Sequence, residues 1–295
     1  MASNLTDGIL NDATSDPPIP PNFRPGAFAG VADDYVRYRL PYPPAMIAEM
    51  LTHVAVPREG AKAIDLACGT GRVALAIVHR FEAIWAVDPE PEMLAAGRHE
   101  ALCQGAGAID WRLDRAESLE APDCGFDLVT VGDAFHRLDR PRVAALAFGW
   151  LAPGGAMVTL GTEGFLDGSA AWRQSLKDVV RTHVGEPARR LGAPTAGLAQ
   201  EIADQEEVLR AAGFDPVFTR NFGLDHTWRL DDLLGNLRST SVLSPTALGD
   251  RHAGFEAEVR AALLKFDPSG RYAETVRFGY TVARKATGPF QPVRR

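Results

Sequence analysis

Short apolar segments alternate with longer amphipathic ones through the first half of the chain. The apolar run at residues 63–67 is too short for a helix and ends abruptly in Cys-Gly-Thr-Gly, so it predicts a buried parallel strand. Strands that alternate with helices indicate an α/β fold, with a parallel sheet covered by helices on both faces. The predicted helices are 72–81, 90–99 and 141–151, and the other predicted strands are 83–87, 108–113, 126–131 and 156–160.

The regular alternation stops after the fifth predicted strand. Residues 161–213 contain helical stretches separated by Gly-Glu-Pro and Gly-Ala-Pro, and we interpret them as a helical insertion that covers the ligand-binding edge as a substrate cap. Trp172, Arg173 and His183 are candidates to line this cap. Ordinary packing of an amphipathic helix explains these three residues equally well.

The remaining segments complete the predicted organisation. A further strand is predicted at residues 216–222, and the alternation of apolar and polar residues at 275–284 predicts an edge strand that closes the sheet. The proline-rich N-terminus predicts a flexible arm. The chain is thus divided into an arm (1–27), a lid and helix (28–60), a core (61–160), a cap (161–213), the C-terminal part of the core sheet (214–285) and a tail (286–295).

Composition and charge narrow the range of partners. A formal net charge of −7 disfavours a nucleic-acid backbone, which requires clustered Lys and Arg. The three cysteines and seven histidines show no metal-ligand spacing, and no acidic cluster suits Mg²⁺, so no metal is predicted. No apolar run is long enough to cross a bilayer, and no secretory signal is recognisable. We expect a cytoplasmic protein without membrane partners; a homodimer is compatible with the sequence.

The glycine-rich turn after the first strand is the main candidate for ligand binding. Gly69 and Gly71 can adopt positive φ and carry no Cβ, so a ligand can lie close to the backbone, and the following helix directs free N–H groups at it. With Ala74 and the downstream acid Asp88, these glycines formally satisfy a dinucleotide fingerprint. The chain has Ala67 where that fingerprint places its first glycine. An S-adenosylmethionine site or an incidental strand-to-helix turn are the alternatives.

Several segments resemble the class I S-adenosylmethionine-dependent methyltransferases. The run Asp65-Leu-Ala-Cys-Gly-Thr-Gly71 resembles their first motif, and Leu151-Ala-Pro-Gly-Gly155 resembles a later one. The segments 35–43 and 133–139 resemble a subfamily that includes trans-aconitate methyltransferase-like (methyltransferase type 11) enzymes, with Leu40 and Asp133 as departures. The resemblance spans residues 31–285 and implies a doubly wound, mostly parallel seven-stranded sheet with a helical cap insertion.

This resemblance also implies a binding role for particular residues. Asp88 would accept the ribose hydroxyls, the segment at Ala116 would meet the adenine edge, and Arg39 would pair with a ligand carboxylate. Arg115 stands where many members of the family carry an acid. The implied cofactor-binding residues are Tyr35, Arg39, Asp65, Ala67, Gly69, Gly71, Asp88, Pro89, Met93, Arg115, Ala116, Glu117, Asp133 and Ala134.

The implied function is methyl transfer from S-adenosylmethionine to a small organic molecule by in-line displacement, with S-adenosylhomocysteine as product. The methyl group would be transferred to an O, N or C atom. A carboxylate or a secondary-metabolite intermediate is among the candidate acceptor molecules. A general base matters only if the acceptor loses a proton, and His136 is the candidate base, with a packing or capping role as its alternative. Two other functions stay open: a protein that keeps the cofactor pocket without methyl transfer, and an NAD-dependent oxidoreductase.

Overall fold

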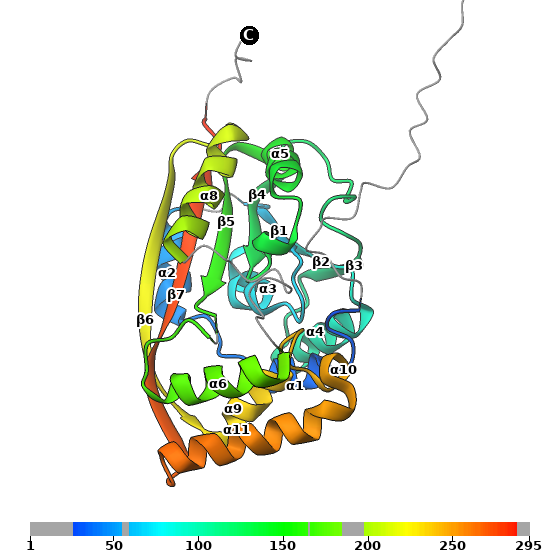
Figure 1. The fold of residues 1–295 in the computed structure, drawn as a ribbon. Helices are drawn as coiled ribbons and strands as arrows, with labels where there is room; N and C mark the ends of the chain where they lie inside the picture. The colour runs from blue at the N-terminus through cyan, green and yellow to red at the C-terminus, as the bar shows by residue number, and fades with distance from the viewer. Residues whose placement is uncertain (1–25, 55–58, 165, 185–197, 288–295) are drawn as a thin grey trace, which may run out of the picture.

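The computed structural model describes residues 26–54, 59–164, 166–184 and 198–287. Its centre is a sheet in which the described residues form seven strands, in the order β3-β2-β1-β4-β5-β7-β6 (Figure 1). The first five strands pair in parallel, whereas β7 is antiparallel to both β5 and β6. The strands are β1 (Lys62–Leu66), β2 (Ala83–Asp88), β3 (Ile109–Leu113), β4 (Phe126–Gly132), β5 (Leu151–Thr162), β6 (Val217–Arg229) and β7 (Arg271–Arg284).

Helices cover both faces of this sheet because the central strands direct apolar side chains to both sides. In β1, Ala63 faces the cluster formed with α2 (Pro44–Thr52) and α3 (Arg72–Ile77), while Ile64 faces the cluster formed with α5 (Arg140–Trp150) and α8 (Leu198–Ala211). The side chains of both residues are fully buried. The predicted doubly wound α/β fold is therefore confirmed. Further helical segments are α1 (Ala32–Tyr38), η1 (Val78–Arg80), α4 (Pro91–Gln104), η2 (Phe135–Arg137), α10 (Pro245–Leu248) and η3 (Gly249–Arg251).

The position of β7 corrects one prediction. We expected residues 275–284 to close the sheet as an edge strand, but β7 lies between β5 and β6, and β6 is the edge strand. Residues Phe278–Arg284 pair with β5, whereas Arg271–Ala283 pair with β6. The half of the β6/β7 hairpin that does not pair with β5 therefore extends beyond it. Partly exposed residues in that half alternate with buried ones, and this alternation led to the prediction of an edge strand.

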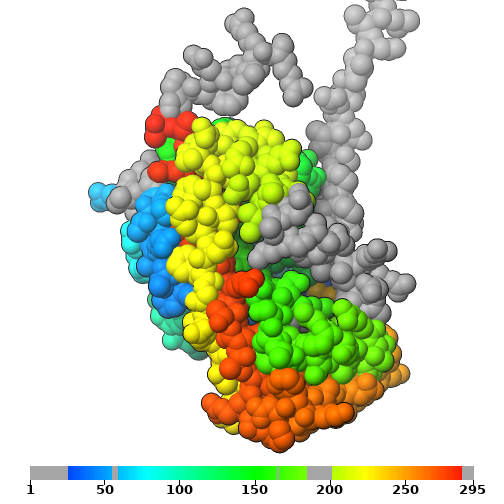
Figure 2. Space-filling view, turned by 60° about the vertical axis from the view of Figure 1, so that its left-hand side comes forward, coloured from blue at the N-terminus to red at the C-terminus, as the bar shows by residue number. Residues whose placement is uncertain are grey.

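A third apolar cluster forms around that far half of the hairpin. Helices α6 (Trp172–Val184), α9 (Leu230–Arg238) and α11 (His252–Phe266) pack together there, and Figure 2 shows α6 lying along α11. Trp172 of α6 packs on Tyr272 of β7, with ring centroids 5.6 Å apart. The sequence pattern did not predict α11.

The two helices of the predicted cap lie in different parts of the molecule. Helix α6 belongs to the cluster around the hairpin, whereas α8 lies on the sheet beside α5, where Leu209 is fully buried. Residues 185–197, which connect them, lie outside the described part of the chain. The same is true of most of the predicted arm and tail. No helix among the described residues combines the length and the apolar character needed to span a membrane.

Candidate active site

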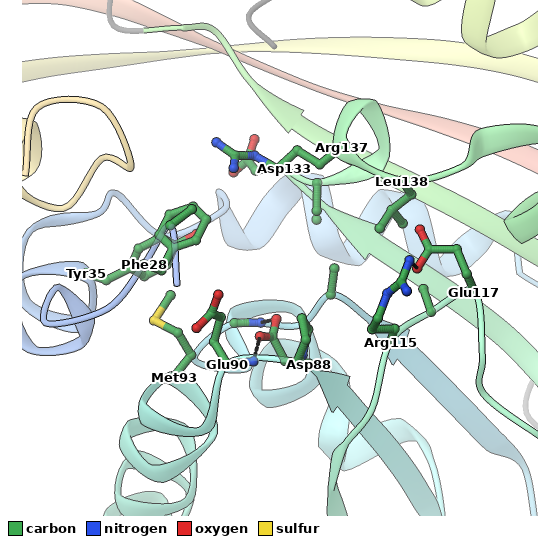
Figure 3. Close-up of a pocket in the computed structure, with 17 residues that line it drawn as sticks. Phe28, Tyr35, Asp88, Glu90, Met93, Arg115, Glu117, Asp133, Arg137 and Leu138 are labelled. Carbon is green, nitrogen blue, oxygen red and sulfur yellow. Dashed lines mark hydrogen bonds and ion pairs between the residues drawn. The ribbon is translucent and has the colours of Figure 1, made fainter. Parts of the chain in front are cut away.

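A pocket opens at the carboxyl ends of β1, β2 and β4, where the topology brings the three strand ends together (Figure 3). It holds about 760 Å³ of space, part of it open to solvent. Open α/β sheets bind ligands at this edge, next to the point where the strand order reverses. The lining residues are Ala27, Phe28, Tyr35, Ala67, Gly69, Asp88, Pro89, Glu90, Met93, Arg115, Ala116, Glu117, Gly132, Asp133, Ala134, Arg137 and Leu138.

The turn between β1 and α3 forms the floor of the pocket. Ala67, Gly69 and Gly71 have φ values of +48°, +56° and +75°, so three of five consecutive residues are left-handed. Gly71 does not line the pocket; a Cβ there would collide with the ring of Trp111. Left-handed backbone strains a residue that has a Cβ, so Ala67 carries a strain that the two glycines avoid.

Asp65 holds this turn from behind instead of facing the pocket. Its carboxylate is fully buried and accepts hydrogen bonds from the N–H of Ala74 at 3.1 Å and from Oγ1 of Thr130 at 2.7 Å. Burial raises the pKa of Asp65 to about 7. Asp65 therefore fixes the start of α3 relative to β4, and it does not line the pocket.

Asp88, at the end of β2, joins two backbone segments of the pocket wall. Its carboxylate accepts hydrogen bonds from the N–H of Gly69 at 2.8 Å and from the N–H of Glu90 at 2.9 Å. Burial raises its pKa to about 6, and these two hydrogen bonds oppose that effect. A carboxylate has about four acceptor positions, so Asp88 keeps capacity for hydroxyl donors of a ligand.

The far wall combines apolar surface with a second acid. Pro89 and Leu138 line the pocket together with Glu117, which follows β3, and Met93 lies across the pocket from Leu138 and Glu117, below Phe28 and Tyr35 (Figure 3). Glu117 accepts a hydrogen bond from the N–H of Asp139 at 3.1 Å, and its carboxylate lies 3.5 Å from a guanidinium nitrogen of Arg115. This wall suits a flat, largely apolar ring with polar edges.

The segment before α1 is held over the opposite side of the pocket. The N–H groups of Gly26 and Gly30 donate to the carboxylates of Glu90 and Glu92 at 2.8 and 2.6 Å. These two bonds place Phe28 beside the pocket opposite Arg115 and Glu117, as Figure 3 shows.

Asp133, at the end of β4, ties together three elements around the pocket. It adopts φ +52° and accepts hydrogen bonds from the N–H of Thr162 at 2.6 Å and from the hydroxyl of Tyr42 at 2.8 Å. Desolvation and the nearby Asp133 charge raise the pKa of Tyr42 well above its ordinary value. The neutral phenol therefore remains a hydrogen-bond donor to Asp133.

Most of the predicted cofactor-binding residues meet in this pocket. Only Arg39, Asp65 and Gly71 are absent from its lining. Arg39 donates from Nε to Oγ of Ser239 at 2.8 Å and lies over the ring of Tyr35, so its guanidinium is engaged in holding α1 against α9. The pairing of Arg39 with a ligand carboxylate stays a prediction.

His136 follows β4 in η2 but does not line the pocket. Burial lowers its pKa to about 4, and the positive charge of Arg137 acts in the same direction. The imidazole is therefore neutral near pH 7. An imidazole with so low a pKa is also a weak base, because its protonated form is unfavourable.

Six pocket residues were missed by the sequence interpretation: Ala27, Phe28, Glu90, Gly132, Arg137 and Leu138. Glu90, Gly132 and Arg137 directly flank predicted site residues and Leu138 lies two residues from His136, so their position near the strand ends was a usable signal. Ala27 and Phe28 had no such signal, because hydrogen bonds to α4 place them at the pocket. Among the described residues, no cluster of His, Cys, Asp and Glu could hold a metal ion.

Comparisons with known proteins agree with this geometry. Residues 63–155 match a family described as a methyltransferase domain. An uncharacterised methyltransferase of Mycobacterium bovis is 31% identical over 55% of this chain and 62% of its own length, so the match leaves more than a third of that relative uncovered. A ubiquinone/menaquinone biosynthesis C-methyltransferase of Dinoroseobacter shibae is 30% identical over 59% of this chain and 76% of its own length.

Two further proteins extend the similarity beyond the matched domain. A trans-aconitate 2-methyltransferase of Streptomyces avermitilis is 29% identical over 75% of this chain and 84% of its own length. A solved structure described as a putative type II methyltransferase from Anaeromyxobacter dehalogenans, 21% identical, superimposes with a TM-score of 0.58, and the match covers 86% of this chain and all of that one. This likeness shows the fold.

Proposed function

The chain belongs to the class I S-adenosylmethionine-dependent methyltransferases, and on that premise we propose that it binds S-adenosylmethionine in the pocket and transfers its methyl group to a small organic molecule. The observation that carries the proposal is the meeting of three strand ends around one cavity: the glycine turn after β1, Asp88 after β2 and Asp133 after β4. Each element offers a different contact to a charged nucleoside.

The proposed orientation of the cofactor follows from the chemistry of the walls. The adenine lies against Met93 and Leu138, with its polar edge near the backbone at Ala116. The ribose hydroxyls donate to the free acceptor positions of Asp88, and the amino-acid tail extends over Gly69 toward Asp133. The sulfonium then lies between the glycine turn and the segment that carries Phe28.

The sulfonium is an activated leaving group, so the protein has chiefly to position the acceptor and exclude water. Phe28, whose segment is held by Glu90 and Glu92, supplies apolar cover on the side of the pocket where the acceptor must approach. Because His136 is buried with a lowered pKa, we expect positioning to contribute more than base catalysis.

In the experiment, the purified protein is titrated with S-adenosylmethionine, S-adenosylhomocysteine and NAD⁺. Calorimetry measures binding, and thermal unfolding measures the effect of each compound on stability. We expect both sulfur compounds to bind and to stabilise the fold by about 2–3 kcal/mol at a hundredfold excess over Kd, and NAD⁺ to have no effect. Radiolabelled S-adenosylmethionine is then supplied with a panel of carboxylic acids, phenols, amines and acidic carbon compounds.

Transfer of label to a member of the panel supports the proposal and identifies the acceptor atom. Binding of the sulfur compounds without transfer to any acceptor class favours a protein that uses the pocket for another purpose. Failure to bind either sulfur compound contradicts the proposal outright.

A further inference from the structure

Strand β3 forms one end of the sheet, opposite the end formed by β6 (Figure 1). Among the described residues, its only strand partner is β2. The free edge of a strand carries backbone N–H and C=O groups that can pair with another chain. Leu113, the last residue of β3, is 62% exposed. This end of the sheet therefore presents strand backbone and apolar surface together.

Backbone hydrogen bonds fix which residues of β3 turn toward its free edge. The carbonyl of Ala108 accepts from the N–H of Ile84 at 2.9 Å, and the N–H of Asp114 donates to the end of β2 at 3.3 Å. Successive residues turn these groups to alternate sides, so even-numbered residues face β2 and odd-numbered residues face the free edge. In agreement, the carbonyl of Trp111 accepts a hydrogen bond from the side chain of Arg98, on α4, at 3.1 Å. The odd-numbered residues are thus the ones that an added strand would meet.

The side chains of β3 are complementary to a second copy of the same strand. When two copies pair antiparallel around Trp111, Asp110 of each copy lies opposite Arg112 of the other. Ile109 of each copy then lies opposite Leu113 of the other. The two Asp110–Arg112 pairs are of the kind without hydrogen bonds between their own backbones, in which side chains approach most closely. Each charged side chain therefore meets its opposite, and each exposed apolar side chain meets another apolar one.

The charged pair is already held on one face of the strand. Asp110 is exposed, Arg112 is partly exposed, and a guanidinium nitrogen lies 2.7 Å from the carboxylate. Cζ of Arg112 also lies 3.2 Å from the centre of the Trp85 ring. A guanidinium has several N–H donors and can bond two carboxylates at once. Arg112 can therefore keep its own Asp110 while it binds that of a second copy.

Helix α4 adds apolar surface beside the same edge. Arg98 reaches the outward carbonyl of Trp111, so the side of α4 that carries Arg98 overlooks the free edge. Leu102 lies four residues further along α4, on that same side, and is 81% exposed. Among the described residues, Leu102 and Leu113 are the two most exposed large apolar residues, and both border this edge.

We propose that β3 pairs with β3 of a second copy of this chain, antiparallel and centred on Trp111, so that two sheets join into one across a two-fold axis. The N–H and carbonyl of Trp111 then bond those of the same residue in the other copy, and an Asp110–Arg112 ion pair lies on each side. Such an interface uses the same surface on both copies, so it closes at a dimer and does not propagate. Because β3 has five residues and the joint buries little area, the dimer is weak and depends on concentration.

The test is sedimentation equilibrium of the full-length chain over a range of concentrations. The native protein should shift from the 31.8 kDa of one chain toward twice that mass. Asp110→Arg and Arg112→Asp each place like charges opposite one another, so we expect either reversal to raise the dimer dissociation constant about tenfold to a hundredfold. The double variant Asp110→Arg/Arg112→Asp restores opposite charges and should associate like the native protein.

An equimolar mixture of the two single variants is the sharpest arm of the experiment. Neither variant should dimerise well alone, but the two arginines of one variant face the two aspartates of the other, so the mixture should form a mixed dimer. Arg220→Asp is the matched control, because it makes the same change of charge on β6, the other edge strand, and should leave association native. Amide hydrogen exchange of Ile109, Trp111 and Leu113 should slow as the native protein is concentrated.

A native protein that stays monomeric at every concentration overturns the proposal. So does a dimer that survives both single reversals, a mixture that forms no mixed dimer, or growth beyond a dimer. Loss of association in Arg220→Asp also overturns it, since it assigns the contact to β6. If a charge reversal does not fold, Asp110→Asn and Arg112→Gln are measured instead, and each should weaken the dimer severalfold.

Discussion

Two buried acids, Asp88 at the pocket and Glu274 in the β6/β7 hairpin, are satisfied in different ways. Within the described part of the chain, Asp88 accepts hydrogen bonds from the backbone N–H groups of Gly69 and Glu90. Glu274 receives the side chains of Arg173 and Trp228, and the ion pair with Arg173 is almost fully enclosed, with side chains 3% and 6% exposed. Each carboxylate is thus held, but with different donors.

This difference separates a carboxylate that binds from one that stabilises. Glu274 has its charge neutralised by a guanidinium, and the pair locks α6 onto the hairpin. Asp88 is held by two backbone N–H groups and not by a guanidinium among the residues that the structure describes, and burial raises its pKa. It keeps a charge that a ligand can use. Variants of the two regions test whether the β6/β7 hairpin chiefly determines stability and the pocket chiefly determines binding.

The largest effect is expected from Glu274→Gln. Removing the charge leaves Arg173 buried without its counter-ion, and breaking such a pair costs about 3–5 kcal/mol. Denaturant unfolding should show this loss, while the affinity of the folded protein for S-adenosylhomocysteine stays native. A loss below about 1 kcal/mol would mean that the pair contributes little, and a parallel loss of affinity would mean that the two regions are coupled.

Asp88→Ala should have the opposite signature. We expect the affinity for S-adenosylhomocysteine to fall about tenfold to a hundredfold, because the ribose hydroxyls lose a charged acceptor. Calorimetry at pH 7.5 measures this directly. Asp88→Asn is the matched variant, since its amide oxygen can still accept one backbone N–H. Near-native affinity in Asp88→Ala would contradict the ribose role.

The raised pKa of Asp65 predicts how stability depends on pH. Its pKa is about 7 in the folded protein and 3.8 in the reference state, so the folded protein binds more protons than the unfolded chain between these values. The free energy of unfolding should therefore rise by about 1–3 kcal/mol from this group as the pH falls from about 7 toward 4. Asp65→Asn should lose this contribution and be more stable than native at pH 8. An unchanged pH slope in Asp65→Asn would contradict the assignment.

The smallest effect is expected from Ala67→Gly. Glycine relieves left-handed strain at φ +48°, and its greater freedom in the unfolded chain offsets part of that gain. We expect a net stabilisation of about 0.5–1 kcal/mol in thermal unfolding. Ala76→Gly, at a helical position of α3, is the control and should be destabilising by a similar amount. Destabilisation by Ala67→Gly would show that the Ala67 methyl contributes packing that outweighs the strain.

The sequence predicted best where one local signal was enough. The run that ends at Leu66 and the glycines after it gave β1, the turn and α3, because apolar burial and left-handed backbone leave a direct mark on composition. The site depends on strand ends, so Asp88 and Asp133 could be placed from the alternation alone. Their contact with the pocket follows from the parallel order of β2, β1 and β4.

The predictions failed where the cause lies in distant contacts. The position of β7 depends on pairing with β5 and β6, which are remote in sequence. Phe28 reaches the pocket through bonds between Gly26 and Glu90 and between Gly30 and Glu92, which are more than sixty residues apart. The engagement of Arg39 by Ser239 spans 200 residues. No local pattern encodes such pairings.

The placement of β7 also sets an order of events during synthesis. The last strand that the structure describes, β7, is inserted between two earlier ones, so until β7 has been synthesised β6 has no sheet partner and β5 can pair only with β4. All of β7, up to residue 284, has to be synthesised before the sheet can be hydrogen-bonded continuously from β4 to β6. A nascent chain halted before Arg271 therefore exposes one edge of β5 and both edges of β6 to chaperones or to other chains, while β1 to β5 are already available to pair with one another.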